Sequence, residues 1–196
     1  MRLRNEDKVL LVKLKAIETI AKYGFDGFSM NKLAKACHIS VATLYIYFKD
    51  RDDLIVSIAK EEIEKMSSSF TKDFVSSADF ESGMRIQWRN RRDYVLANPY
   101  GYQFLEQLRG STYKLEILKP MLANFKKAME TFFKGCIERG EINAIAMEAF
   151  WSVAYAPLYS LLRFDRDGKS IDGKNFKLSE EVFWQTFDSV MKALKK

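Results

Sequence analysis

Apolar residues in this chain recur at the spacing of α-helices and do not alternate strictly over any strand-length stretch. The clearest case predicts a helix from about Asn5 to Tyr23, and Gly24 follows it where a helix-ending glycine is common. The apolar face expected for this helix consists of Leu10, Leu14, Ile17 and Ala21, with Val9, Ala16 and Ile20 beside them. Prolines occur only at positions 99, 120 and 157. The pattern therefore indicates an all-α protein.

Capping residues and breaks in the apolar pattern mark the other helices. Ser29 and Ser40 can each cap a short helix, and Asp50 can cap a long one that carries acidic residues in its first turn. Pro157 should kink the helix in which it falls, because its ring clashes with the preceding turn. The predicted helices cover residues 29–37, 40–48, 51–74, 80–97, 100–109, 115–139, 143–164 and 179–194, with a polar, glycine-bearing loop at 166–175.

The two short helices over Ser29–Phe48 have the spacing of a helix-turn-helix. The first has an inward face of Leu33, Ala34 and Cys37, and the second has Leu44 and Phe48. Ile39 fills the angle between them. In such a motif the first helix supports the second against the major groove of DNA.

The outward face of the second helix fits contact with DNA. It carries Val41, Ala42, Thr43, Ile46 and Tyr47, where a helix that faces water would carry Glu, Lys or Gln. Such groups can touch thymine methyls, base edges and phosphate oxygens. Phosphate contacts are also expected from Lys49 and Arg51, and from the start of the preceding helix, at Ser29, Met30, Asn31 and Lys32.

The positive charge is concentrated in the same part of the chain. Residues 1–49 hold 9 Lys and Arg against 4 Asp and Glu, whereas residues 50–196 hold 23 against 22. This asymmetry is typical of a small module that faces a polyanion and is attached to a larger, nearly neutral body. A chance excess on a solvated surface is the alternative.

The segment resembles the DNA-binding domain of the TetR family of bacterial transcriptional regulators. The resemblance rests on the string Ser40-Val41-Ala42-Thr43-Leu44-Tyr45-Ile46-Tyr47-Phe48, followed by Arg51 and Leu54, and covers about 45 residues from roughly Ala16 to Ile58. Two residues depart from the family pattern. His38 replaces the turn glycine, and Ala42 replaces a glycine or proline of the recognition helix. The operator sequence therefore cannot be taken from a relative.

The resemblance implies a cytoplasmic regulator, expected to be a repressor, that binds double-stranded DNA as a homodimer. It implies a helix-turn-helix domain over residues 1–50 and a larger helical domain for effector binding and dimerisation over 51–196, with about nine helices in all. Tyr45 could instead pack against the first short helix. Together with the cap residue Ser40, the implied DNA contacts are Met30, Asn31, Val41, Ala42, Thr43, Tyr45, Ile46, Tyr47 and Arg51.

The two helices near the C-terminus are apolar on almost every side. Such a helix is buried, or it faces its own core on one side and a partner on the other. By resemblance, these two helices pair with their copies in a dimer, and an ordinary monomer core is the alternative. The candidate interface residues are Ala154, Leu158, Leu161, Leu162, Phe183, Phe187, Val190 and Leu194.

The resemblance also implies a small effector bound inside the larger domain, and the composition of that domain favours a hydrophobic, partly aromatic molecule. The candidate pocket residues, which could equally form a plain core, are Trp88, Tyr94, Tyr102, Phe104, Met121, Phe125, Phe133, Trp151 and Tyr155. Arg85, Arg89 and Arg92 form a basic stripe that favours ion pairs or solvent over an anionic ligand. A DNA-bound adaptor that responds to a protein partner is the alternative function.

Several other classes find no support in the sequence. No apolar run approaches the roughly 20 residues of a membrane span, and the charged N-terminus does not read as a secretory signal. Cys37 and Cys136 are expected to be reduced core thiols. The single histidine lies in the predicted turn, so we expect no enzyme, and we expect no cofactor or metal. Residues 165–168 begin like a calcium loop but lack the later oxygen ligands, so they read as a turn.

Overall fold

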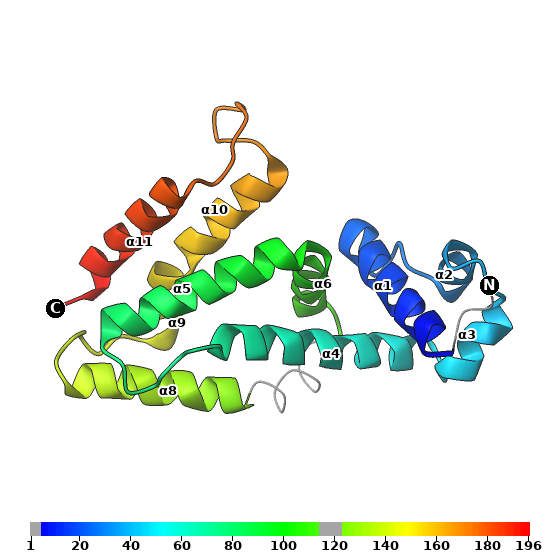
Figure 1. Ribbon diagram of the computed structural model, residues 1–196, viewed down its shortest axis with the longest axis horizontal. Helices are drawn as coiled ribbons and strands as arrows, with labels where there is room; N and C mark the ends of the chain where they lie inside the picture. Colours follow the sequence, from blue (N-terminus) through cyan, green and yellow to red (C-terminus); the bar gives the residue numbers. More distant parts are fainter. Residues whose placement is uncertain (1–4, 114–122) are drawn as a thin grey trace. The chain divides into compact units, whose positions relative to one another are not determined.

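A computed structural model describes residues 5–113 and 123–196, and the prediction of an all-α fold is confirmed (Figure 1). Over these residues there is no strand, only isolated bridges between Ile142 and Lys195 and between Lys169 and Asn175. The predicted helix starting at Leu115 is described from Ala123 onward. The helices are α1 Asn5–Tyr23, α2 Met30–Ala36, α3 Val41–Tyr47, α4 Arg51–Thr71, α5 Phe80–Ala97, α6 Pro99–Arg109, α8 Ala123–Glu138, α9 Met147–Ala154, α10 Ala156–Asp167 and α11 Glu180–Leu194.

The chain packs as two compact units, each with its own core. The first unit holds α1, α2, α3, most of α4, and α6, while the second holds the end of α4 with α5 and α8 to α11. The first unit takes in α6 because α6 packs along α1. The predicted division at residue 50 marks the end of the helix-turn-helix and remains a prediction.

The core-facing side of α1 differs from the predicted apolar face. Leu10 and Leu14 are 58% and 54% exposed, whereas Val12, Ala16 and Ile20 are fully buried. The buried residues recur every four positions and meet the apolar sides of α2, α3, α4 and α6 in one core cluster. Ile17 and Ala21 of the predicted face are also buried, so the prediction fails only at Leu10 and Leu14, in the first half of the helix.

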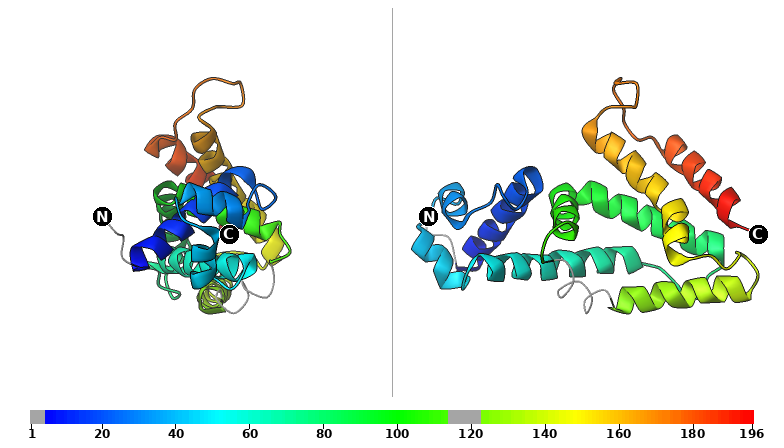
Figure 2. Two further views of the ribbon diagram at one scale, coloured as in Figure 1. Left: turned by 90° about the vertical axis from the view of Figure 1, so that its right-hand side faces the viewer. Right: turned by 180° about the vertical axis from the view of Figure 1, so that it is seen from behind.

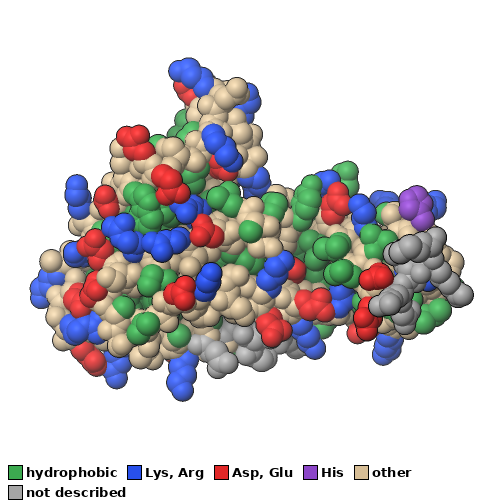
Figure 3. All heavy atoms as spheres, viewed as in Figure 1, with side chains coloured by type: hydrophobic (Ala, Val, Ile, Leu, Met, Phe, Trp, Pro, Cys, Tyr) green, Lys and Arg blue, Asp and Glu red, His purple; other side chains and the backbone are tan. Residues whose placement is uncertain are grey.

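The helix-turn-helix forms through the predicted caps. The Ser29 hydroxyl accepts a hydrogen bond from the Lys32 N–H at 3.3 Å, and the Ser40 hydroxyl accepts one from the Thr43 N–H at 3.1 Å. His38 has a φ of 54°, the left-handed conformation that glycine adopts without strain. The prediction that His38 adopts the turn glycine's conformation is confirmed, and its side chain is exposed at the surface (Figure 3).

In the second unit, α5 packs against the C-terminal helices. Trp88 of α5 is fully buried between Phe183 and Phe187, with ring centroids 5.6 and 5.4 Å away, and its indole N–H donates to the Ala154 carbonyl at 2.9 Å. Helices α10 and α11 lie side by side as a hairpin, joined by the predicted polar loop (Figure 2). Pro157 lies in the first turn of α10, so a complete helix break replaces the predicted kink.

Both cysteines are free and buried, as predicted. Burial raises the pKa of the Cys37 thiol and raises that of Cys136 to about 12. None of the helices over residues 5–113 and 123–196 is both long and apolar enough to cross a membrane. In the same residues, no three His, Cys, Asp or Glu side chains gather as a metal site would require.

Candidate nucleic-acid interface

The outer face of α3 is an uncharged surface that projects into solvent. Tyr45 and Ile46 are 52% and 76% exposed, and Ala42 is exposed beside them. Leu44 on the opposite face is fully buried. The half-buried residues Val41 and Tyr47 pack against the core at the edge of this face. Tyr45 is thus more than half exposed, although it lies beside Asn31 of α2, the helix against which it could alternatively have packed.

Side chains from α2, α3 and α4 converge beside this face. An open hollow of about 540 Å³ is lined in part by Ser29, Asn31, Tyr45 and Arg51. The side chains of Asn31 and Tyr45 are exposed there, and those of Ser29 and Arg51 are half-buried. Residues predicted separately, from a helix start and from a recognition helix, thus line one concave surface that mixes hydroxyl, amide and guanidinium groups. Such groups contact DNA phosphates.

Three of the predicted residues also have structural roles. Met30 is only 7% exposed and its side chain belongs to the core cluster, so a phosphate contact of this residue would come from its backbone N–H at the start of α2. Lys32 donates to the Gly27 carbonyl at 3.1 Å. Arg51 donates through Nη2 to the Phe25 carbonyl at 2.7 Å and lies over the Phe28 ring. Lys49, in contrast, has an exposed side chain directly after α3.

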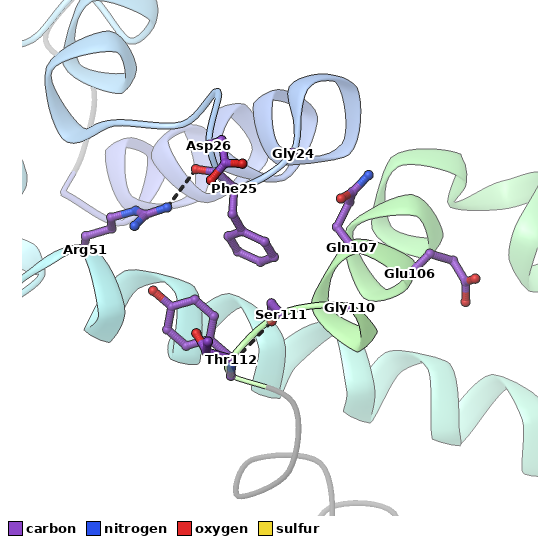
Figure 4. A pocket seen from close by; sticks show the side chains of 10 residues that line it. Gly24, Phe25, Asp26, Arg51, Glu106, Gln107, Gly110, Ser111 and Thr112 are labelled. Atoms are coloured by element: carbon purple, nitrogen blue, oxygen red, sulfur yellow. Dashed lines mark hydrogen bonds between the residues drawn. The ribbon is translucent and has the colours of Figure 1, made fainter.

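Arg51 also borders a second pocket, between the α1–α2 loop and the end of α6 (Figure 4). This pocket measures about 560 Å³, and Phe25 and Tyr113 face each other across it at 5.4 Å between ring centroids. The Tyr113 hydroxyl donates to the Asp52 carboxylate of α4, and burial together with this carboxylate raises the pKa of Tyr113 to about 12. The segment after α6 is thereby fixed to the start of α4.

Comparisons with known proteins agree on the type of this helix-turn-helix domain. The model of the bacterial regulatory proteins, tetR family, matches residues 15–58, which include the whole helix-turn-helix. The chain is 25% identical over 177 residues, 90% of each chain, to an HTH-type transcriptional regulator of Haemophilus influenzae. The fold matches a TetR family regulator of Marinobacter aquaeolei with a TM-score of 0.83 and 22% identity over 100% of both chains. Residues 15–58 therefore form a helix-turn-helix domain of the tetR type, and the whole chain has the fold of TetR family regulators.

With this domain the protein is a helix-turn-helix transcriptional regulator, and regulators of the tetR family bind DNA. It is also 23% identical over 130 residues, 65% of this chain and 66% of the other, to the fatty acid metabolism regulator protein of Bacillus subtilis. These relatives are regulators and not enzymes.

The residues predicted for the dimer interface of this regulator lie mostly inside its own core. Only Leu161 among them is half-buried and reaches the surface. The buried ones, each at most 9% exposed, are Ala154, Leu158, Leu162, Phe183, Phe187, Val190 and Leu194. In an apolar helix the largest side chains pack inward, so they are not available to a partner. A row of half-buried residues remains on the outside of α9 and α10, namely Val153, Pro157, Leu161 and Phe164.

The residues predicted for the effector pocket fall into separate groups. Tyr102 and Phe104 belong to the first unit, where Phe104 is fully buried in the core. Trp88, Tyr94 and Phe133 are buried in the second unit, and Met121 lies outside the described residues. The remaining three, Phe125, Trp151 and Tyr155, surround one buried cation, Arg91.

Arg91 is the polar residue that sequence reasoning missed. In the predicted basic stripe, Arg85 and Arg92 form ion pairs, and Arg89 is exposed to solvent. The favoured interpretation of Arg85 and Arg92 as ion-pairing residues is therefore confirmed. One signal could have found Arg91: it follows Gln87 by four positions and precedes Tyr94 by three, on the face of α5 that is otherwise apolar.

Proposed function

We propose that the protein is a homodimeric repressor that binds a palindromic operator and is released by a small hydrophobic effector. The observation that carries the proposal is the uncharged, exposed face of α3, with Ala42, Tyr45 and Ile46, next to the hollow that contains Arg51. A surface of that composition is costly in water and suits base edges and thymine methyls.

Dimerisation is the second part of the proposal. Two recognition helices about one DNA turn apart read a palindrome on one face of the duplex. We place the interface on the half-buried residues Val153, Pro157, Leu161 and Phe164, because the other candidate residues of α10 and α11 are buried in the protomer. Pro157, Leu161 and Phe164 follow helical spacing along α10, so they form a strip that a second copy can cover by two-fold symmetry.

Effector control is the third part. The aromatic residues around Arg91 give the second unit a mostly apolar cluster with one charged group, a composition that suits a small-molecule site. Within the first unit, α6 packs on α1 and its following segment is bonded to α4 through Tyr113 and Asp52. A displacement of α6 would therefore move the helices that carry α3. The fatty acid metabolism regulator among the relatives is in line with an apolar effector.

The test begins with selection of binding sites from random double-stranded DNA, followed by anisotropy titrations on the selected operator. Ala42→Gln is expected to change the preferred sequence, because the new amide can read a base edge. Lys49→Ala is expected to weaken binding to all sequences and to reduce the slope of log K against log salt by about 0.9, the value for one phosphate contact.

Lys60→Ala removes the same charge and is the control. Lys60 is exposed like Lys49, but it lies in α4, further from α3 along the chain. An unchanged preference in Ala42→Gln together with an unchanged salt slope in Lys49→Ala would refute this docking of α3. Operator binding that responds to a protein partner and to no small molecule would instead favour the adaptor function.

A further inference from the structure

Arg91 of α5 is a fully buried cation that forms no ion pair with any residue of 5–113 or 123–196. Its side chain is 1% exposed, Nη1 donates to the Tyr159 hydroxyl at 2.9 Å and Nη2 donates to Gln87 Oε1 at 3.3 Å. Its Nε has no hydrogen-bond partner. No carboxylate of residues 5–113 or 123–196 lies within ion-pairing distance of the guanidinium. A guanidinium remains charged even when buried, so the charge is not removed by deprotonation.

Aromatic rings enclose this guanidinium. Its central carbon lies 4.1 Å from the ring centroid of Tyr155, 4.4 Å from that of Phe70, 5.1 Å from that of Trp151 and 5.6 Å from that of Phe125. Ring faces attract a cation, but they carry no net charge. The rings therefore favour the position of the charge without neutralising it.

Among the arginines of α5, Arg91 alone is buried without an ion pair to a described residue, whereas Arg89 is exposed to solvent. Arg92 pairs with Glu180 at 2.7 Å, and Arg85 pairs with Glu81 at 3.5 Å. Both pairs lie near the surface, where an ion pair contributes little. The buried position, where a missing anion costs most, is the one left without it.

The ring cluster extends from the core to the surface. Tyr155 and Phe70 are buried, Phe125 and Tyr159 are half-buried, and Trp151 is 36% exposed. These residues come from the end of α4, from α8, from α9 and from the start of α10, and all belong to the second unit (Figure 1). A ligand that entered past Trp151 and Phe125 would meet apolar ring faces first and the guanidinium last.

We propose that Arg91 binds the carboxylate of the effector and that the effector is a monocarboxylate with an apolar or aromatic body. The inference rests on the proposed function, since it assigns the chemical class of the ligand. The unpartnered Nε–H and an Nη–H on the same edge form the planar pair of donors that a carboxylate accepts in two parallel bonds. The rings pack against the body, and the carboxylate supplies the missing negative charge.

The same chemistry excludes the neutral counterparts of such acids. An alcohol with the same body would bury its apolar part equally well, but it would leave the guanidinium uncompensated. A site that contains a buried polar group discriminates strongly against analogues that cannot satisfy it. Preference for the acid over its alcohol is therefore the distinguishing property of this site.

The test is a thermal-shift titration of the full-length protein with two matched pairs, octanoate against 1-octanol and 2-naphthoate against 2-naphthalenemethanol. At least one acid is expected to raise the Tm of the wild type by about 2 °C or more at millimolar concentration, and neither alcohol to do so. Arg91→Met should abolish the shift. Arg89→Met is the matched control, because Arg89 is exposed on the same helix, and it should retain the shift.

Arg91→Lys provides a second variant that keeps the positive charge if Arg91→Met does not fold. A lysine cannot form two parallel bonds, so the affinity for the acid should fall about tenfold or more. The proposal is overturned by equal shifts with acid and alcohol, by a full shift in Arg91→Met or Arg91→Lys, or by the absence of any shift with both acids.

Anisotropy measurements with operator DNA separate this proposal from the proposed function. Release of DNA by an alcohol as well as by its acid would uphold effector control and overturn the role of Arg91. Binding of an acid that depends on Arg91 but does not release DNA would uphold the site and overturn its role as the effector site.

Discussion

Glu62 is a buried carboxylate in the first unit. It is 8% exposed, its Oε2 has no hydrogen-bond partner, and Lys65 Nζ lies 3.9 Å from its Oε1. Burial raises the pKa of Glu62 above its ordinary value of 4.5. The folded state therefore holds this proton to higher pH than the unfolded chain does. Its contribution to stability is fully present below pH 4.5 and is lost as the pH rises through the raised pKa.

Glu62→Gln should therefore be more stable than the wild type at pH 7, by about 1 kcal/mol or more, because it removes a poorly compensated buried charge. The difference should vanish near pH 4, where Glu62 is protonated in both states. Urea denaturation followed by circular dichroism at several pH values measures both effects. Glu64→Gln is the control, since Glu64 is exposed on the same helix, and it should show little difference at any pH. A difference that does not depend on pH would contradict the assignment.

At the scale of single residues, the sequence was informative where local geometry decides. The serine caps and the strained turn at His38 depend on hydrogen bonds and sterics within a few positions, so they could be predicted. The burial of Met30 and Arg91 depends on which distant helices cover them, and no local rule provides that. Arg91 in particular belongs to a residue type that is almost never fully buried without a partner.

At the scale of helices, close packing in the second unit depends on Gly83 in the first turn of α5. A Cβ at this position would lie 2.3 Å from a ring carbon of Phe132, which is fully buried among the rings of Phe74, Phe80 and Phe133. The ring has no free space in which to move. The contact explains a glycine inside a helix, where it would otherwise cost about 1 kcal/mol relative to alanine.

Gly83→Ala is accordingly expected to destabilise the protein by about 1–2 kcal/mol, because overpacking outweighs the gain in helix propensity. Phe132→Leu should remove most of that cost, since the smaller side chain leaves room for the methyl group. A double-mutant cycle by urea denaturation measures this coupling. Additive effects of the two substitutions would show that Gly83 and Phe132 do not constrain each other.

Helix boundaries were predictable to within a few residues, because caps and breakers are local signals. The sequence was less informative about whether a helix-breaking residue bends a helix or ends it. Pro157 could kink one helix or separate two, and the outcome depends on whether the carbonyls it leaves unpaired find other partners. Here the Tyr155 N–H still bonds to the Trp151 carbonyl and closes α9, so α10 starts afresh with the proline in its first turn.

At the scale of the whole molecule, the family resemblance followed from one short segment and the all-α fold from the apolar spacing along the chain, whereas the surfaces proposed to join two copies did not follow from either. A helix that is apolar all round has no sequence signal that separates the side facing its own core from the side facing a partner. The largest residues were therefore assigned to the dimer, and most of them proved to be buried in the protomer. What remains for a partner is the row of half-buried residues that includes Leu161.

Leu161→Glu tests that row, because a charge at its centre would be buried without a partner in the dimer and solvated in the monomer. The variant should sediment as a monomer and keep a Tm close to that of the wild type. It should bind a palindromic operator about 100-fold or more weakly, because two linked helix-turn-helix domains bind far more tightly than one. Analytical ultracentrifugation and anisotropy titration measure these properties. Ile171→Glu is the control, since Ile171 is 90% exposed in the loop between α10 and α11 and should tolerate the same change. If Leu161→Glu remained a dimer, the interface would lie on another face of the protein.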